Sequence, residues 1–230
     1  MRAMHATAEV DFHADAFLER VSPHFVDDPL GRPFDAASSD LTLNPSFAAQ
    51  MLGRRLKDAA VLIGLVEAAE GTRVILTQRT EHLSSHAGQV AFPGGKIDAE
   101  DGSAIVTALR EAEEEIGLDP AHVDPVGCLA PYASGSGYRI VPVIARVRPG
   151  LAYVPNPHEV ADVFEVPLAF LMDGANHRIG SRVWNGRTGY FYEMPYGERY
   201  IWGVTAGIIR QIWERAYGRG GEAIAGPRDG

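Results

Sequence analysis

The sequence predicts an α/β fold, in which a mixed, curved sheet lies between helices as an α/β/α sandwich. Two β-rich segments, 59–66 and 73–78, flank the turn formers Glu70-Gly71 and predict a hairpin. An amphipathic helix over 103–116 follows the glycine turn at Pro93-Gly94-Gly95. This order of strand, loop and helix is typical of layered α/β domains.

The chain of 230 residues is long enough for one well-packed domain with extensions. Residues 1–55 are rich in turn formers and predict an N-terminal arm packed on the domain, with a short helix over 14–21. We expect the domain itself to span 56–217. The Gly-rich segment 218–230 is expected to be a disordered tail.

The helix over 103–116 has the clearest boundaries. Asp101 or Ser103 is expected to cap its N-terminus, and Gly117 lies where a left-handed C-terminal cap is needed. Helical spacing predicts a buried stripe made of Ile105, Leu109, Ala112 and Ile116.

The C-terminal half contains weaker patterns. They predict strands over 140–147 and 163–166, a short helix over 168–172, a hairpin of 182–184 with 190–194 around Asn185-Gly186, and an amphipathic helix over 200–217.

Composition narrows the class of protein. A net charge of −9 argues against nucleic-acid binding through a broad basic face. The longest apolar run, 59–66, is too short to cross a bilayer, and acids near Met1 argue against a signal peptide. A single cysteine, Cys128, excludes an internal disulfide and fits a reducing compartment, so a cytoplasmic location is expected.

Acidic residues are concentrated in 96–117, which contains seven acidic residues and only two basic ones. Glu111, Glu114 and Glu115 have i, i+3, i+4 spacing, which predicts one helical face roughly opposite the buried stripe. Alone, such a run is usually a solvated surface. Next to the glycine turn, however, clustered carboxylates and a carbonyl form an oxygen donor set suited to a hard divalent cation. Arg110 is placed to orient one of these carboxylates through a bidentate pair.

Residues 95–118, GKIDAEDGSAIVTALREAEEEIGL, resemble the Nudix box, G-x5-E-x7-R-E-U-x-E-E-x-G-U. The positions that match are Gly95, Arg110, Glu111, Ala112, Glu114, Glu115, Gly117 and Leu118. The first acid departs from the pattern, because Asp101 replaces Glu and one extra residue separates it from Arg110. We expect Asp101 to be a structural or capping residue.

The segment before the box is similar to the signature of coenzyme A pyrophosphatases within this family. It comprises Ile75-Leu76-Thr77-Gln78-Arg79, Gly88 and Phe92-Pro93-Gly94-Gly95. Two positions differ, with Thr80 where Ser or Ala is usual and Ser84 where Arg is usual.

These resemblances imply a Nudix fold and hydrolysis of a pyrophosphate bond in coenzyme A or a derivative, giving 4′-phosphopantetheine, or its acyl form, and 3′,5′-ADP. They imply Mg²⁺ or Mn²⁺ held by Glu111, Glu114, Glu115 and the Gly95 carbonyl, with catalytic roles for Glu114, Glu115 and Arg110. Glu159 is a candidate general base from outside the box, and Arg79 and Arg139 are candidates for contacting a substrate phosphate.

Two other functions stay open at this point. One is hydrolysis of another nucleoside diphosphate derivative, such as ADP-ribose, NADH or a dinucleoside polyphosphate. The other is a non-catalytic Nudix-fold nucleotide sensor, against which the three intact box glutamates argue. The expected partner is a small nucleotide pyrophosphate, with neither nucleic acid nor membrane, and a homodimer is one alternative for the oligomeric state.

Overall fold

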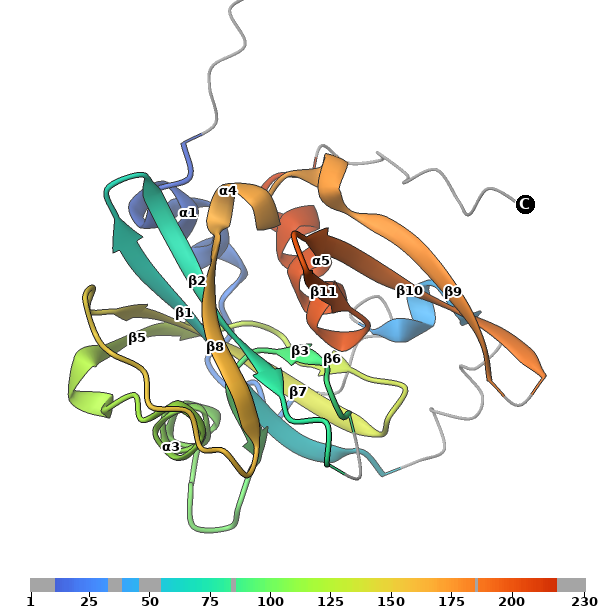
Figure 1. The fold of residues 1–230 in the computed structure, drawn as a ribbon, viewed down its shortest axis with the longest axis horizontal. Coiled ribbons are helices and arrows are strands. Elements are labelled where there is room, and N and C mark those ends of the chain that lie inside the picture. Colours follow the sequence, from blue (N-terminus) through green and yellow to red (C-terminus); the bar gives the residue numbers. More distant parts are fainter. Residues whose placement is uncertain (1–10, 33–38, 46–54, 84–85, 185, 219–230) are drawn as a thin grey trace, which may run out of the picture.

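The predicted hairpin is the centre of the fold in the computed structural model, which describes residues 11–32, 39–45, 55–83, 86–184 and 186–218 (Figure 1). Strand β1 (Lys57–Ala68) pairs antiparallel with β2 (Gly71–Arg79), and Ala68 lies opposite Gly71 at the turn. On its other side β1 pairs in parallel with β7 (Tyr138–Val147). The main sheet is therefore mixed, as predicted.

The remaining strands extend this sheet and form a second one. The main path runs β3-β2-β1-β7-β5, with β4 paired to β1, β6 to β7 and β8 to β2, and the second sheet runs β11-β10-β9. Their bounds are β3 Val90–Ala91, β4 Gly94–Lys96, β5 Val123–Cys128, β6 Tyr132–Ala133, β8 Val160–Pro167, β9 Arg178–Trp184, β10 Arg187–Tyr196 and β11 Arg199–Trp202.

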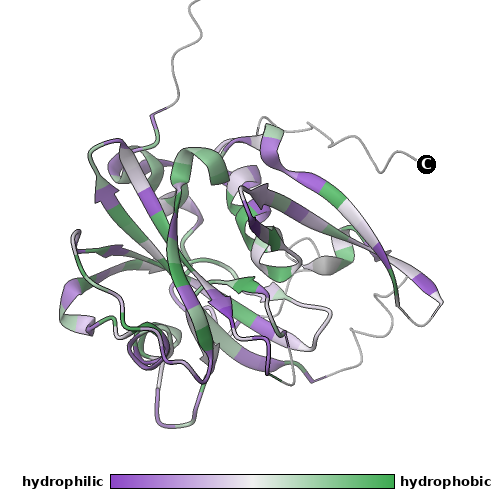
Figure 2. Cartoon of the chain, in the orientation of Figure 1, coloured by the Kyte–Doolittle hydropathy of each residue, from purple (hydrophilic) through white to green (hydrophobic). Residues whose placement is uncertain are grey.

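Helices cover both faces of the main sheet. On one face, α3 (Ala104–Ile116) packs on a buried cluster that includes Leu62, Ile75 and Val143. On the other, α1 (Ala14–Val21), α4 (Leu168–Leu171) and α5 (Val204–Ala216) share a second cluster with alternate residues of the same strands. Hydrophobic residues dominate the middle of the central strands (Figure 2). This is the predicted α/β/α arrangement.

Helix α3 has the predicted ends but a different buried stripe. Ser103 caps its N-terminus, and Gly117 ends it at a φ of 65°. Its buried face is formed by Ala104, Thr107, Ala108, Ala112, Glu115 and Ile116, whereas Ile105 and Leu109 are only half-buried. The small alanines at i, i+4 and i+8 face the sheet, and the larger apolar residues lie beside them.

The helix predicted over 200–217 is wrong in its first part. Residues 199–202 form strand β11, which pairs with β10, and Gly203 separates this strand from α5 with a φ of 63°. Cross-strand pairing therefore determines the structure of a segment whose apolar spacing also fits a helix. The other strands and short helices predicted for the C-terminal half are confirmed, with longer strands than expected.

The predicted helix of the arm is confirmed as α1, and its Phe17 and Val21 are buried. The division of the chain at residues 55 and 217 stays a prediction, and most of the tail lies outside the described residues. Within the part of the chain that the structure describes, no helix is long and apolar enough to span a membrane.

Candidate functional site

The site is built around the glycine turn between β3 and α3. A Cβ atom at Gly94, where φ is 154°, would lie 2.3 Å from the Ala60 carbonyl oxygen. A Cβ atom at Gly95 would lie 2.5 Å from the Glu111 carboxyl carbon. Gly94 has no space for a side chain, because the backbone of β1 lies against it, whereas a side chain at Gly95 would have to displace the Glu111 carboxylate.

The pairing of β4 with β1 indicates where the two glycine carbonyls face. Ladder hydrogen bonds run from Ile97 N to Asp58 O at 3.1 Å and from Leu62 N to Pro93 O at 2.8 Å. Gly95 lies opposite Ala60 between these pairs. Regular alternation directs the Gly95 carbonyl toward β1 and the Gly94 carbonyl away from it. The resemblance implied the Gly95 carbonyl alone as a metal ligand and missed that of Gly94, although the two consecutive glycines were a signal for both.

Glu115 is buried, which corrects the prediction that the three box glutamates share one face opposite the buried stripe. Its side chain is 3% exposed because it continues the inner row of α3 three residues after Ala112. One carboxylate oxygen accepts a hydrogen bond from Gly94 N at 3.1 Å, and the other lies 3.5 Å from Arg79 Nη1. Burial nevertheless raises the pKa of Glu115 to about 7.

The other two box glutamates are progressively more exposed. The side chain of Glu111 is 17% exposed and that of Glu114 is 57% exposed. Arg110 Nη1 lies 3.0 Å from Glu111 Oε1 and 3.2 Å from Glu114 Oε2. Burial also raises the pKa of Glu111. The site therefore has one buried, one half-buried and one exposed carboxylate.

Asp101 holds Arg110 in place. The guanidinium donates from Nε to Asp101 Oδ1 at 2.8 Å and from Nη2 to Oδ2 at 2.9 Å. Asp101 also accepts hydrogen bonds from the Thr107 hydroxyl at 2.8 Å and the Asp98 amide at 2.9 Å. Hydrogen bonding with Arg110 holds the Asp101 pKa well below its usual range. This geometry agrees with the expected structural role, whereas the helix cap is Ser103, which accepts from Val106 N.

Glu159 reaches the box from a distant part of the chain. The loop that carries it crosses the C-terminus of α3, where Asn156 N donates to Glu115 O at 2.8 Å. Thr80 N donates to Glu159 O at 3.0 Å, which joins the loop to the end of β2. The charge of Glu159 contributes to the raised pKa values of Glu111 and Glu115. Glu159 is thus within electrostatic reach of both, as its candidacy requires.

The two candidate phosphate contacts differ. Arg79 lies at the site, pairs with Glu115, and has a buried Nε without a hydrogen-bond partner among the described residues. Arg139 instead donates to Asp58 Oδ1 at 2.6 Å and to the carbonyls of Arg32 and Leu30, each at 2.9 Å. Arg139 therefore anchors the N-terminal arm to the sheet, and its contact with substrate stays a prediction. Thr80 is buried, and Ser84 lies outside the described residues.

The donor atoms at this site suit a hard divalent cation. Carboxylate and main-chain oxygens from α3 and the glycine turn lie side by side, as the contact between Gly95 and Glu111 indicates. In the described ranges, however, no group of three or more His, Cys, Asp or Glu side chains converges to hold a metal ion. The carboxylates are instead paired with arginines, Glu111 and Glu114 with Arg110 and Glu115 with Arg79. The donor atoms therefore fit a hard divalent cation by their chemistry. To bind one, the side chains of Glu111 and Glu114 would have to turn away from Arg110.

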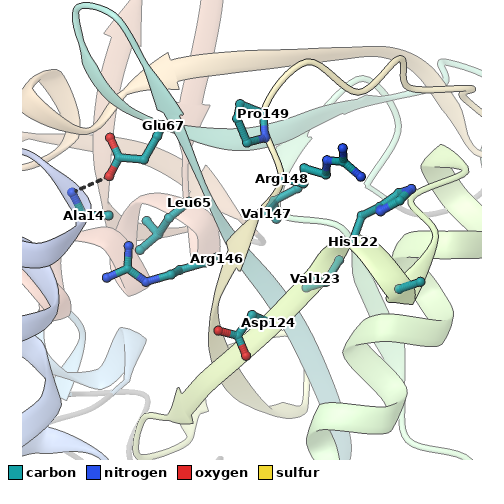
Figure 3. A pocket seen from close by; sticks show the side chains of 11 residues that line it. Ala14, Leu65, Glu67, His122, Val123, Asp124, Arg146, Val147, Arg148 and Pro149 are labelled. Atoms are coloured by element: carbon teal, nitrogen blue, oxygen red, sulfur yellow. Dashed lines mark hydrogen bonds between the residues drawn. The ribbon is translucent and has the colours of Figure 1, made fainter.

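A cavity of about 450 Å³ lies at the other end of β1 (Figure 3). It contains none of the predicted site residues. Its charged side chains are of both signs, with Arg146 and Arg148 alongside Glu67 and Asp124. Glu67 is already bonded to the Ala14 amide at 2.9 Å. This mixture creates no strong positive field, so we do not assign a phosphate site there.

Comparisons with known proteins identify the family of this chain. The model of the NUDIX domain matches residues 56–181, more than half of the chain. Two relatives, both named "Uncharacterized Nudix hydrolase NudL", come from Escherichia coli (strain K12) and Shigella boydii serotype 4 (strain Sb227). Each is 41% identical over 170 residues, covering 74% of this chain and 87% of the relative.

A solved structure of a Nudix hydrolase from M. Smegmatis, RenU, is also similar. It is 28% identical, with a TM-score of 0.42, and the match covers 48% of this chain and 70% of that one. The NUDIX model match and the NudL relatives are sufficient to assign the family. The chain belongs to the Nudix hydrolases and is a pyrophosphohydrolase of nucleoside diphosphate derivatives.

Proposed function

We propose that this Nudix hydrolase cleaves the pyrophosphate bond of coenzyme A or a derivative, giving 4′-phosphopantetheine or its acyl form and 3′,5′-ADP. The observation that carries the proposal is the contact between Arg79 and Glu115, with 3.5 Å between Nη1 and Oε1. Arg79 ends the first part, Ile75 to Arg79, of the pre-box segment that resembles the coenzyme A pyrophosphatase signature. Its position supports a role for that segment in substrate binding.

The proposed cofactor is Mg²⁺ or Mn²⁺, held by Glu111, Glu114, Glu115 and a glycine-turn carbonyl. The cation would activate water and neutralise charge on the pyrophosphate. The Gly94 carbonyl joins that of Gly95 as a candidate ligand, because it faces away from β1. A Gly95 carbonyl in the ladder still keeps a second lone pair.

The chain's own side chains would provide positioning and proton transfer. The Arg79 side chain is 24% exposed, so its guanidinium can contact a phosphate oxygen while Nη1 pairs with Glu115. Glu159 is the proposed general base, because it is half-exposed and close enough to raise the pKa of Glu115. Glu115 and Glu114 are the alternatives from within the box. Phosphoryl displacement requires such positioning more than a covalent nucleophile.

Steady-state kinetics on coenzyme A, dephospho-coenzyme A, ADP-ribose, NADH and a dinucleoside polyphosphate would test this proposal, at matched free Mg²⁺ and again with Mn²⁺. We expect coenzyme A to have the highest kcat/KM. It should exceed dephospho-coenzyme A by a factor of about 3–10, because an exposed or half-buried charge contact is worth about 1 kcal/mol.

Two outcomes would contradict the proposal in different ways. Equal or faster turnover of dephospho-coenzyme A means that the 3′-phosphate is not recognised. Turnover of ADP-ribose, NADH or the dinucleoside polyphosphate without turnover of coenzyme A would replace the proposed substrate and leave the Nudix chemistry unchanged. Arg139→Ala, compared on coenzyme A and dephospho-coenzyme A, would test whether this arginine contacts the 3′-phosphate.

A further inference from the structure

The end of β2 carries side chains on both faces of the main sheet. Arg79 shares a face with Ile75, which belongs to the core cluster under α3, and reaches Glu115. Gln78 shares the opposite face with Leu76, which belongs to the other cluster. Whatever holds Gln78 therefore lies directly behind the site.

Arg199 of β11 holds this opposite face. Its Nη1 lies 3.5 Å from Gln78 Oε1, and its Nη2 donates to the Asp162 carboxylate. Its guanidinium carbon lies 4.5 Å from the centre of the Phe164 ring. Gln78 and Asp162 are cross-strand partners in β2 and β8, so one arginine from the second sheet joins both strands.

The backbone is irregular immediately beyond this pair. The register of β2 with β8 shifts between Gln78 and Arg79, so that Arg79 pairs with Val160. The extra residue is Ala161 of β8, and a β-bulge bends the strand that contains it and redirects the side chains of that strand. Here it lies between the residue held by Arg199 and the residue that contacts Glu115. Glu159 lies immediately before β8, so Arg79 and Glu159 both lie just past the irregularity.

The contacts of Arg199 with Gln78 and Asp162 are also connected to the loop before the box. Gln78 Nε2 donates to Gly88 O, and Arg79 N donates to Gln89 O at 2.9 Å. Strand β11 also contacts β3, which leads into the glycine turn. Figure 1 shows the second sheet beside this part of the main sheet.

We propose that Arg199 is a positioning residue for the hydrolase site. By joining Gln78 to Asp162, it fixes β2 and β8 to each other at the bulge, which keeps Arg79 on Glu115 and Glu159 beside the box. Residue 199 lies outside the matched NUDIX segment, 56–181. The second sheet would thus supply a constraint that the segment matched by the family model does not contain. The effect on rate rests on the proposed roles of Arg79 and Glu159, whereas the effect on the backbone does not.

The backbone is tested first, in the full-length protein without substrate. Hydrogen exchange of the Arg79 and Thr80 amides is expected to accelerate about tenfold in Arg199→Ala. It should stay within about twofold in Arg182→Ala, an exposed arginine of the same sheet. Arg199→Lys should be intermediate, because lysine keeps the charge opposite Asp162 but lacks the two-pronged fork.

Kinetics then provide a readout that a general loss of stability would not produce. On the best substrate, Arg199→Ala should lower kcat/KM about tenfold alone, but at most about twofold in a background that carries both Arg79→Ala and Glu159→Gln. Additive losses, or exchange rates equal to those of Arg182→Ala, would overturn the proposal. If the Arg79 and Thr80 amides exchange faster in Arg199→Ala but the protein hydrolyses no coenzyme A, this inference stands and only the proposed substrate is rejected.

Discussion

The two faces of α3 carry the same residue type in opposite environments. On the inner face Glu115 is 3% exposed and packed behind three alanines, whereas Glu114 on the outer face is 57% exposed. Burial raises the pKa of Glu115 to about 7, even with the Gly94 amide and Arg79 as partners. A stable helix has no need of a buried acid next to its apolar row, so we expect the inner face to be the functional side of the helix.

The largest expected effect tests whether Glu114 and Glu115, despite their different environments, both bind the catalytic cation. Glu115→Gln and Glu114→Gln should each lower kcat by at least about a hundredfold, because losing a cation ligand removes several kcal/mol of transition-state stabilisation. Single-turnover and steady-state rates at saturating Mg²⁺ would measure this loss. Glu113→Gln, an exposed neighbour on the same helix, is the matched control and should retain near-normal turnover. Normal rates in Glu114→Gln would restrict the ligand role to the inner face.

The second prediction concerns the pair formed by Asp101 and Arg110, whose guanidinium also contacts the exposed Glu114. Asp101→Ala should destabilise the protein by about 3 kcal/mol, because Arg110, Thr107 and the Asp98 amide all lose a buried acceptor. Urea denaturation would measure the loss in the free energy of unfolding. The control is Asp98→Ala, whose exposed carboxylate lies 3.7 Å from Arg110 and should contribute less than about 1 kcal/mol. Equal losses in the two variants would show that the bidentate pair is not the stabilising contact.

The smallest effect is the dependence of stability on pH that Glu115 alone should cause. Its folded-state pKa of about 7 exceeds the ordinary value of 4.5. Below pH 4.5 the carboxyl is protonated in both folded and unfolded chains and has no effect. Between these two pKa values the folded state retains a proton that the unfolded chain loses, so stability falls as pH rises.

In the absence of divalent cations, Glu115→Gln should therefore be more stable than wild type above pH 8. The difference should be on the order of 2 kcal/mol, because unfavourable contact of the new amide with Arg79 offsets part of the gain. Near pH 4 the gain disappears, and Glu115→Gln should be less stable than wild type by the cost of that contact. Denaturant titrations in chelator at several pH values would measure it, with Glu113→Gln as the flat reference. A pH-independent difference would mean that burial does not control this group.

Local sequence was sufficient for the elements whose signals agree with one another. The β1–β2 hairpin has β-branched strands around a glycine turn, and α3 has a serine cap and a terminal Gly117, so propensity and pattern gave the same prediction. The segment from Arg199 to Trp202 was misassigned because its apolar spacing continues smoothly into α5. Only its pairing with β10 and the positive φ of Gly203 separate strand from helix.

The same division holds for the site. The sequence by itself determined which oxygen donors are available, because the glutamates and glycines of the box are contiguous along the chain. Only the tertiary structure decided that Glu115 is buried, that Arg79 and Glu159 reach it, that Arg139 holds the arm, and that Arg199 lies behind the bulge. The physical reason is that exposure and contact depend on which face of an element meets the core. Residues 79, 115, 159 and 199 are brought together by sheet pairing and helix packing that no local pattern encodes.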